Sequence, residues 1–267
     1  MNERESPVRP GVDFAGLYDA HPEYDARRRE GSFEREQVAL EVQHFKLPHL
    51  AAVLAMPWPQ RVLEIGCATG ELIGAVPAPA GSLRMGLDIS ARNIAVARER
   101  FPHVSFHAGD VHSLRVDGFD AVVLSDVLEH VSDDTAFLAD AARLGHQVLI
   151  NLPLETNWLN RGRAYGPEDV SGHLRAYSLD AGLRLIARAG LQVLRWHQVW
   201  VHETPVEALR RQLRVRHHGH AYSGAWPARL AKQGLLGAAV AVRPFGRRLL
   251  ASNLFALAVP NGAGRGP

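Results

Sequence analysis

Val62–Gly70, with the sequence VLEIGCATG, is the stretch that determines the fold. Its first four residues are mostly apolar and predict a short buried strand, and a helix is expected directly after the turn. Gly66 lets the chain turn sharply, and the small residues Ala68 and Gly70 let a ligand approach the backbone. The helix directs free N–H groups and its positive dipole end towards that ligand. A strand, a glycine turn and a helix in this order predict a nucleotide-type binding site in an α/β sheet.

The glycine spacing excludes two common nucleotide-binding loops. A dinucleotide-binding loop has the pattern G-x-G-x-x-G, whereas the glycines here are Gly66 and Gly70, with Ala68 in the place of the second glycine. A phosphate-binding loop needs Gly-Lys-Ser/Thr, and Gly70 is instead followed by Glu71, whose charge would repel a phosphate. A nicotinamide-dependent dehydrogenase and a P-loop nucleotidase are therefore both disfavoured.

Acidic residues follow the next two strands that the pattern predicts. Asp88 ends the strand expected over 83–88, where a carboxylate can accept hydrogen bonds from both hydroxyls of a ribose. Asp110 follows the strand expected over 104–107. The alternatives are that Asp88 only caps the helix that begins after Ser90, and that Asp110 is an ordinary turn residue.

A fourth motif, Phe119–Val131 (FDAVVLSDVLEHV), follows the glycine turn, Asp88 and Asp110 along the chain. In this order the motifs resemble those of class I S-adenosylmethionine-dependent methyltransferases, and the fourth is similar to that of small-molecule methyltransferases of the ubiquinone-biosynthesis type. The resemblance implies that Glu64 lies beside the methionine end of the cofactor, Asp88 binds its ribose and Asp110 contacts its adenine. The implied cofactor-binding residues are Glu64, Gly66, Cys67, Ala68, Gly70, Asp88, Ile89, Asp110, Val111 and Ser125.

Two histidines are the candidate catalytic residues. His130 ends the fourth motif, and His173 lies in Gly172–Ser178 (GHLRAYS), which is similar to a stretch that related methyltransferases place beside the acceptor. A hydroxyl acceptor must lose a proton, and imidazole can take one near neutral pH. The alternative is that each histidine only forms hydrogen bonds within the core. Asp126 and Glu129 also fit a capping box.

No metal is expected, because the sequence contains no cluster of carboxylates that matches a catalytic magnesium site. Asp126 alone offers one ligand of the required kind. Activity is therefore predicted to survive chelation.

The alternation of strands and helices predicts a parallel sheet covered on both faces. The resemblance adds detail: a Rossmann-like α/β fold with a seven-stranded, mostly parallel sheet and an antiparallel last strand. Helical spacing over 33–56, divided near Pro48, belongs to an N-terminal cap. The expected organisation is a disordered tail (1–11), a helical cap (12–60), a methyltransferase domain (61–260) with a helical insert (204–250), and a second disordered tail (261–267).

Composition is that of an ordinary globular protein, with 267 residues, 46% hydrophobic and 22% charged residues, and a net charge of +2. Nothing in it indicates a large nucleic-acid surface. Cys67 is the single cysteine, no apolar signal segment is evident and no run is long enough to span a membrane. We expect a cytoplasmic monomer or homodimer without stable membrane insertion.

The insert predicts something about the acceptor. Between Thr204 and Leu250 the chain has nine basic residues and a single acid, Glu207, and two helices are expected at 205–214 and 227–236. If this insert and the N-terminal cap form the walls of the acceptor pocket, the acceptor is acidic, phosphate-bearing or carrier-bound. The alternative is a solvated helical pair or a dimer surface.

The function that follows is methyl transfer from S-adenosylmethionine to a small molecule, with O-methylation of a hydroxyl on a secondary metabolite, sugar or quinone-like compound favoured. One alternative is a methyltransferase-like binding protein without activity, against which Glu64, Gly66, Asp88 and Asp110 argue. Another is an N-methyltransferase that acts on a macromolecule. Enzymes that methylate base nitrogens often carry an Asn/Asp-Pro-Pro-Tyr/Phe motif where this chain has SDVLEH.

Overall fold

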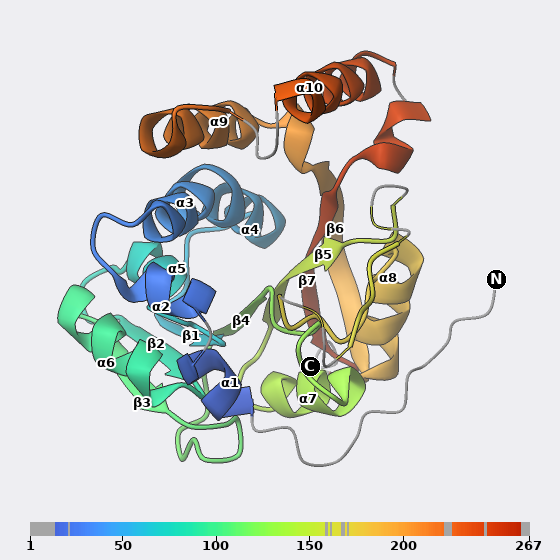
Figure 1. Ribbon diagram of the computed structural model, residues 1–267. Coiled ribbons are helices and arrows are strands. Elements are labelled where there is room, and N and C mark those ends of the chain that lie inside the picture. Colours follow the sequence, from blue (N-terminus) through green and yellow to red (C-terminus); the bar gives the residue numbers. More distant parts are fainter. Residues whose placement is uncertain are drawn as a thin grey trace.

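A seven-stranded sheet forms the centre of the computed structural model, in the order β3-β2-β1-β4-β5-β7-β6 (Figure 1). The first five strands pair in parallel, and β7 runs antiparallel to both β5 and β6. This confirms the predicted mostly parallel sheet with an antiparallel last strand. The strands are β1 (Arg61–Ile65), β2 (Leu83–Asp88), β3 (Ser105–Ala108), β4 (Ala121–Ser125), β5 (Val148–Leu154), β6 (Leu191–Trp200) and β7 (Ser252–Pro260). The structure describes residues 14–20, 22–157, 160, 162–166, 169, 171–221, 226–242 and 245–262.

Helices cover both faces of this sheet, because alternate residues of each central strand point to opposite sides. In β4, Val123 packs into one core cluster with the helices α4 (Leu47–Leu54), α5 (Glu71–Ala75) and α6 (Ala91–Arg100). Its neighbours Val122 and Leu124 pack into a second cluster with α7 (Asp134–Ala142) and α8 (Leu179–Arg188). The central strands are apolar on both faces for this reason. Their polar residues lie mainly at the ends of the strands.

The N-terminal cap consists of α1 (Phe14–Ala20), α2 (Pro22–Arg28), α3 (Phe33–Glu41), η1 (Val42–Lys46) and α4. The helix predicted over 33–56 is divided, as expected, but the irregularity precedes Pro48. It is the π-helical turn η1, and Pro48 itself lies in the first turn of α4, where a missing N–H costs nothing. The predicted tail at 1–11 lies outside the described residues, as do 263–267 of the second tail.

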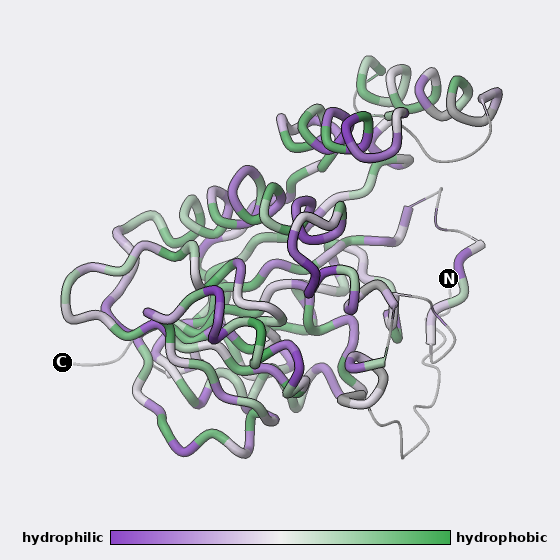
Figure 2. The backbone as a smooth tube through the Cα atoms, turned by 60° about the vertical axis from the view of Figure 1, so that its left-hand side comes forward, coloured by the Kyte–Doolittle hydropathy of each residue, from purple (hydrophilic) through white to green (hydrophobic). Residues whose placement is uncertain are grey.

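The short helix η3 (Val201–Glu203) precedes the insert. The insert contains the two predicted helices, α9 (Pro205–His218) and α10 (Trp226–Ala241), both longer than expected, and then η4 (Phe245–Leu249). Ion pairs join α9 to α3: Arg210 lies 2.8 Å from Glu41, and Arg216 contacts Glu36. The insert and the N-terminal cap therefore meet through α9. In Figure 2, α9 and α10 lie at the periphery, away from the sheet. Among the described residues, the structure contains no helix with the length and apolar character that a bilayer span requires.

Candidate active site

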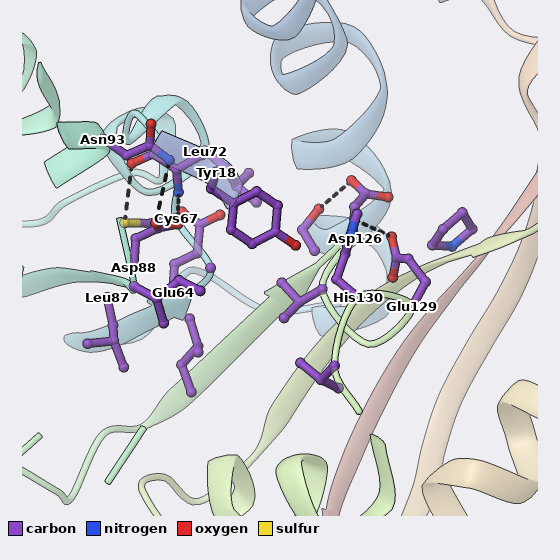
Figure 3. Close-up of a pocket in the computed structure, with 18 of the residues that line it drawn as sticks. Tyr18, Glu64, Cys67, Leu72, Leu87, Asp88, Asn93, Asp126, Glu129 and His130 are labelled. Atoms are coloured by element: carbon purple, nitrogen blue, oxygen red, sulfur yellow. Dashed lines mark hydrogen bonds and ion pairs between the residues drawn. The ribbon is translucent and has the colours of Figure 1, made fainter. Parts of the chain in front are cut away.

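One cavity of about 820 Å³ lies where the carboxyl ends of β1, β2 and β4 meet the N-terminal cap. This is the edge at which open α/β sheets bind ligands, and the volume is typical of a ligand pocket. Figure 3 shows Glu64, Cys67 and Asp88 at one end, Asp126, Glu129 and His130 at the other, and Tyr18 of the cap between them. Every residue that the sequence analysis assigned to cofactor binding or catalysis lines this cavity except Gly70.

The glycine turn after β1 depends on backbone conformations that side chains disfavour. Gly66 has φ +75°, and a Cβ atom there would lie 2.5 Å from a methyl group of Val127. The N–H groups of Gly66 and Cys67 both donate to the carbonyl of Leu87, at 2.7 and 3.0 Å. These bonds hold the turn against the end of β2, which brings the turn and Asp88 to the same wall of the cavity.

Ala68, where glycine is commoner in the resembling motif, also adopts a left-handed conformation, with φ +46°. Such a conformation costs a non-glycine residue about 1–2 kcal/mol. Its N–H donates to Oδ2 of Asp88 at 2.8 Å, a hydrogen bond to a carboxylate that offsets the cost. The turn therefore accommodates the methyl group of Ala68 through its backbone bond to Asp88.

Asp88 is buried at the centre of this wall. Its carboxylate accepts from the N–H groups of Ala68 and Ser90, and the amide of Asn93 lies 3.5 Å away. The cap of α6 is supplied by the hydroxyl of Ser90, which accepts from the N–H of Asn93 at 3.1 Å. Capping therefore does not account for Asp88, whose carboxylate instead holds the turn and lines the cavity; the ribose contact remains a prediction.

Glu64 is buried beside the same turn. Its Oε2 accepts from the N–H of Ile73 at 2.8 Å, and burial raises the pKa of Glu64 to about 8. Burial also raises the pKa of the neighbouring Cys67 thiol well above its usual value. Cys67 is consequently a packing residue, because only a thiolate is an effective nucleophile.

Asp110, Val111 and Ile89 lie at this end of the cavity as well. The carboxylate of Asp110 accepts from the N–H of Ser113 at 2.8 Å, so the turn role weighed for it is present in the structure. Val111 is buried and Ile89 is partly exposed, as an adenine platform requires. The adenine contacts stay predictions.

At the end of β4, a polar network that the sequence analysis missed joins the cap to the sheet. Nζ of Lys46 lies 2.6 Å from Oδ2 of Asp126, and the amide of Asn151 donates to both Ser125 and Asp126. Burial opposes the ionisation of Asp126, but the Lys46 ammonium holds the pKa of Asp126 below its usual value. Asp126 has a φ of +55°, a backbone conformation that is rare for a residue with a side chain and that strains the chain at this position.

The capping box considered for Asp126 and Glu129 is not formed. No helix begins there; α7 starts later, and its N-cap is Asp133, whose side chain accepts from Ala136 at 2.9 Å. Glu129 is instead buried, and neither of its carboxylate oxygens has a hydrogen-bond partner among the described residues. Burial, with nearby Asp126, raises its pKa well above the usual value.

His130 and His173 lie together at this end, with ring centroids 4.7 Å apart. Nδ1 of His130 lies 3.1 Å from the carbonyl of Gly172, and Nδ1 of His173 lies 2.6 Å from Oε2 of Glu155. Because both partners accept, each Nδ1 carries the proton and each Nε2 keeps a free lone pair. Burial and neighbouring His173 lower the pKa of His130 to about 4, so its ring is neutral at pH 7.

One ligand atom from each of Glu129, His130 and His173 lies within 4.8 Å of the other two. Two imidazoles are oriented by a carbonyl and a carboxylate, and Glu129, which has no hydrogen-bond partner among the described residues, lies 3.7 Å from Nε2 of His130; together they form a donor set that fits a divalent cation. The sequence analysis expected no metal and did not foresee this cluster. The three residues come from two segments about 40 positions apart, and only the fold brings them together.

Comparison with known proteins agrees with the motifs. Residues 62–146 match a family model described as a methyltransferase domain. The ubiquinone biosynthesis O-methyltransferase of Rhizobium rhizogenes is 30% identical over 160 residues, 49% of this chain and 62% of that protein. The chain spans less than two thirds of the length of such relatives, and 44% of the Xanthomonas campestris enzyme of the same name.

Solved structures share the whole fold. Magnesium protoporphyrin IX methyltransferase from Synechocystis PCC 6803 superimposes with a TM-score of 0.55 at 15% identity, over 92% of this chain and 95% of that one. Phosphoethanolamine N-methyltransferase 2 from Haemonchus contortus superimposes with a TM-score of 0.59 at 17% identity, over 94% of this chain and 60% of that one. Strand order, motifs and family model agree: residues 62–146 are similar to a methyltransferase domain, and the chain shares the fold of these methyltransferases of solved structure.

Proposed function

We propose that this protein binds S-adenosylmethionine and transfers its methyl group to a hydroxyl of a small-molecule acceptor. The observation that carries the proposal is a single cavity with two chemically different ends. One end holds the glycine turn, Glu64 and Asp88, and the other holds His130, His173 and Glu129. A cofactor at the first end would present its methyl group towards the second.

The reaction is an in-line displacement. A lone pair of the acceptor oxygen forms the new C–O bond, and the C–S bond breaks with its electrons going to sulfur, which gives S-adenosylhomocysteine. The sulfonium already activates the methyl group, so the protein contributes by orienting the two reactants. The hydroxyl proton must also be removed, and Nε2 of His173 or of His130 is the proposed base. His130 is the weaker base, because its pKa is lowered to about 4.

Acceptor screening with S-adenosylmethionine labelled in its methyl group tests this function. The panel should pair each hydroxyl compound, phenolic or sugar-like, with its amine analogue, and include acidic and phosphorylated members. We expect labelled product from a hydroxyl acceptor and none from the matched amine. Label transfer only to amines would contradict O-methylation, and failure to bind the cofactor in calorimetry would contradict the function as a whole.

The affinity for S-adenosylmethionine is expected to rise with pH through Glu64. The family resemblance places Glu64 beside the cationic methionine end of the cofactor, where the carboxylate form is favoured. In the free protein its pKa is about 8, so a proton must leave before or during binding. Below its raised pKa, Glu64 is protonated. Because the cofactor binds best to the Glu64 carboxylate, the affinity for the cofactor increases as pH rises. Linkage predicts about 50-fold tighter binding at pH 8 than at pH 6.

The matched control is Glu64→Gln, which keeps an acceptor for the N–H of Ile73 but cannot titrate. Titration of the cofactor's own amine affects both proteins equally, so the difference between their pH profiles isolates Glu64. Calorimetry at pH 6, 7 and 8 measures it. Parallel profiles for the two proteins would show that Glu64 stays neutral in the complex.

Chelation is expected to lower the methyl-transfer rate, contrary to the expectation from sequence. The donor set of Glu129, His130 and His173 fits a divalent cation, which when bound would lower the pKa of a nearby hydroxyl. Dialysis against EDTA followed by assays with and without added Mg²⁺, Mn²⁺ or Zn²⁺ measures the effect. A bound cation would occupy the Nε2 lone pairs, so full activity after dialysis, with no metal detected in the protein, would assign the two histidines to proton transfer instead.

A further inference from the structure

Helix α10 exposes an unusual amount of apolar surface. Trp226 is 69% exposed, Leu230 51% and Leu235 45%, and Val242 and Phe245 just after the helix are 58% and 69% exposed. Among the exposed residues of α10 that the structure describes, Gln233 is the only polar one. Scattered single apolar residues are normal on a protein surface, but a contiguous set on one element marks an interaction site.

The exposed residues lie on the half of α10 that faces away from the protein. At about 3.6 residues per turn, Leu230 falls opposite Ala239, and Trp226 and Leu235 fall at the two borders of the exposed side. Leu236 and Ala239 are buried in a small core cluster with Leu250, packed against Trp200 and Val240. Both views place α10 at the edge of the molecule, and Figure 2 shows it extending beyond α9 (Figures 1 and 2). The helix is therefore anchored along one side and bare along the other.

Charge is distributed unevenly along the chain, and this identifies the occupant of the bare face. Residues 204–250 contain nine of the 30 Lys and Arg residues and only one of the 28 Asp and Glu residues, Glu207. The chain as a whole carries a net charge of only +2, so the remainder is acidic and the insert is basic. The basic residues Arg210, Arg216 and Arg247 are paired with Glu41, Glu36 and Glu203, and the insert keeps an excess of cations beyond these pairs. No acidic residue occurs in the sequence from Ala208 to Pro267. The exposed apolar face lies within the basic part.

We propose that α10 and Phe245 dock on the surface of an anionic lipid bilayer. A helix that is apolar on one face, carries cations in its vicinity and is too short to span a membrane lies in the interface, with its apolar side chains below the headgroups. Trp226 stands at the start of α10 and Phe245 follows its end, and aromatic rings favour this depth. Arg248, which is exposed, lies three positions after Phe245, whereas Arg247 is paired with Glu203 at 2.9 Å.

A second copy of the chain is the weaker occupant. Pairing two bare α10 faces would bring two basic inserts together, and like charges at close range oppose such a contact. An anionic surface complements the same charges, and the attraction extends about 8–10 Å at physiological salt. This docking is independent of the methyl-transfer chemistry, because neither Phe245 nor any described residue of α10 lines the cavity.

Vesicle flotation of the purified full chain tests the proposal. We expect binding to vesicles of phosphatidylcholine with phosphatidylglycerol, little binding to phosphatidylcholine alone, and weaker binding as salt rises. The double variant Leu230→Glu/Leu235→Glu should reduce binding by about tenfold or more. The matched control is Leu194→Glu, a leucine on β6 that is also 51% exposed but far from α10 in sequence, which should bind as the wild type does.

Circular dichroism and cofactor calorimetry on each variant establish that the chain is folded. Three outcomes would overturn the proposal: no binding of the wild type to anionic vesicles, equal binding of the wild type and the double variant, or equal binding to neutral and anionic vesicles. Analytical ultracentrifugation adds a fourth. A wild-type dimer that the double variant abolishes would assign the face to a second copy.

Discussion

His130→Ala and His173→Ala are each expected to lower the rate of methyl transfer by about 10²–10⁴-fold, the range for loss of a positioned acid–base group, with no change in the affinity for S-adenosylmethionine. The reason is the separation of the two ends of the cavity. The imidazoles contact Gly172, Glu155 and each other, whereas the glycine turn and Asp88 form their own hydrogen-bond network. Removal of a ring should therefore affect turnover and leave cofactor binding intact.

Glu155→Gln separates a positioning role from a direct one. Glu155 holds the proton on Nδ1 of His173, and an amide in its place can also donate, which permits the wrong tautomer. We expect an intermediate loss of turnover from this variant and none from His146→Ala, an exposed histidine in the turn before β5. Single-turnover rates and calorimetry give the two readouts. Near-normal turnover in both His130→Ala and His173→Ala would assign catalysis to orientation alone.

The cofactor end of the cavity could be anticipated from sequence because its geometry is local. The turn at Gly66 and Gly70 follows one strand, and Asp88 ends the next strand along, so short motifs describe the whole wall. Parallel neighbours in a sheet bring their carboxyl ends to the same edge. The predicted parallel sheet, with the cofactor motifs at the ends of its strands, therefore anticipated that Asp88 lies beside the turn.

The acceptor end depends on contacts between distant segments, and sequence patterns do not encode these. Lys46 lies at the end of the π-helical turn η1, just ahead of α4, and from there it reaches Asp126. The sequence analysis predicted only that the helix is divided near Pro48. Lys46 is also one of only two lysines in an arginine-rich chain, which was the one available hint. Glu129 is part of the fourth motif, and the sequence analysis considered it only as part of a capping box. Its burial without hydrogen-bond partners depends on the fold and could not be inferred from the motif.

Asp88→Asn is expected to weaken S-adenosylmethionine binding by about 10²-fold or more. The proposed role gives Asp88 two hydrogen bonds to the ribose hydroxyls, and bonds to a charged group contribute about 1.5–3 kcal/mol each. Asparagine keeps the size of the side chain and one acceptor oxygen, so that either Ala68 or Ser90 retains a partner for its N–H. Alanine would leave both N–H groups without a partner. A weaker affinity could then come either from the lost ribose contacts or from a loosened turn, and the measurement could not separate the two.

The cofactor itself supplies the decisive control, through a double-mutant cycle with an analogue that lacks the ribose hydroxyls. If Asp88 binds those hydroxyls, their removal weakens binding to the wild type strongly and binding to Asp88→Asn little, and the two losses are not additive. Additive losses would mean that Asp88 only supports the turn through Ala68 and that another group binds the ribose. Calorimetry on the four combinations separates these cases, because a structural defect weakens the binding of the cofactor and of the analogue by the same factor.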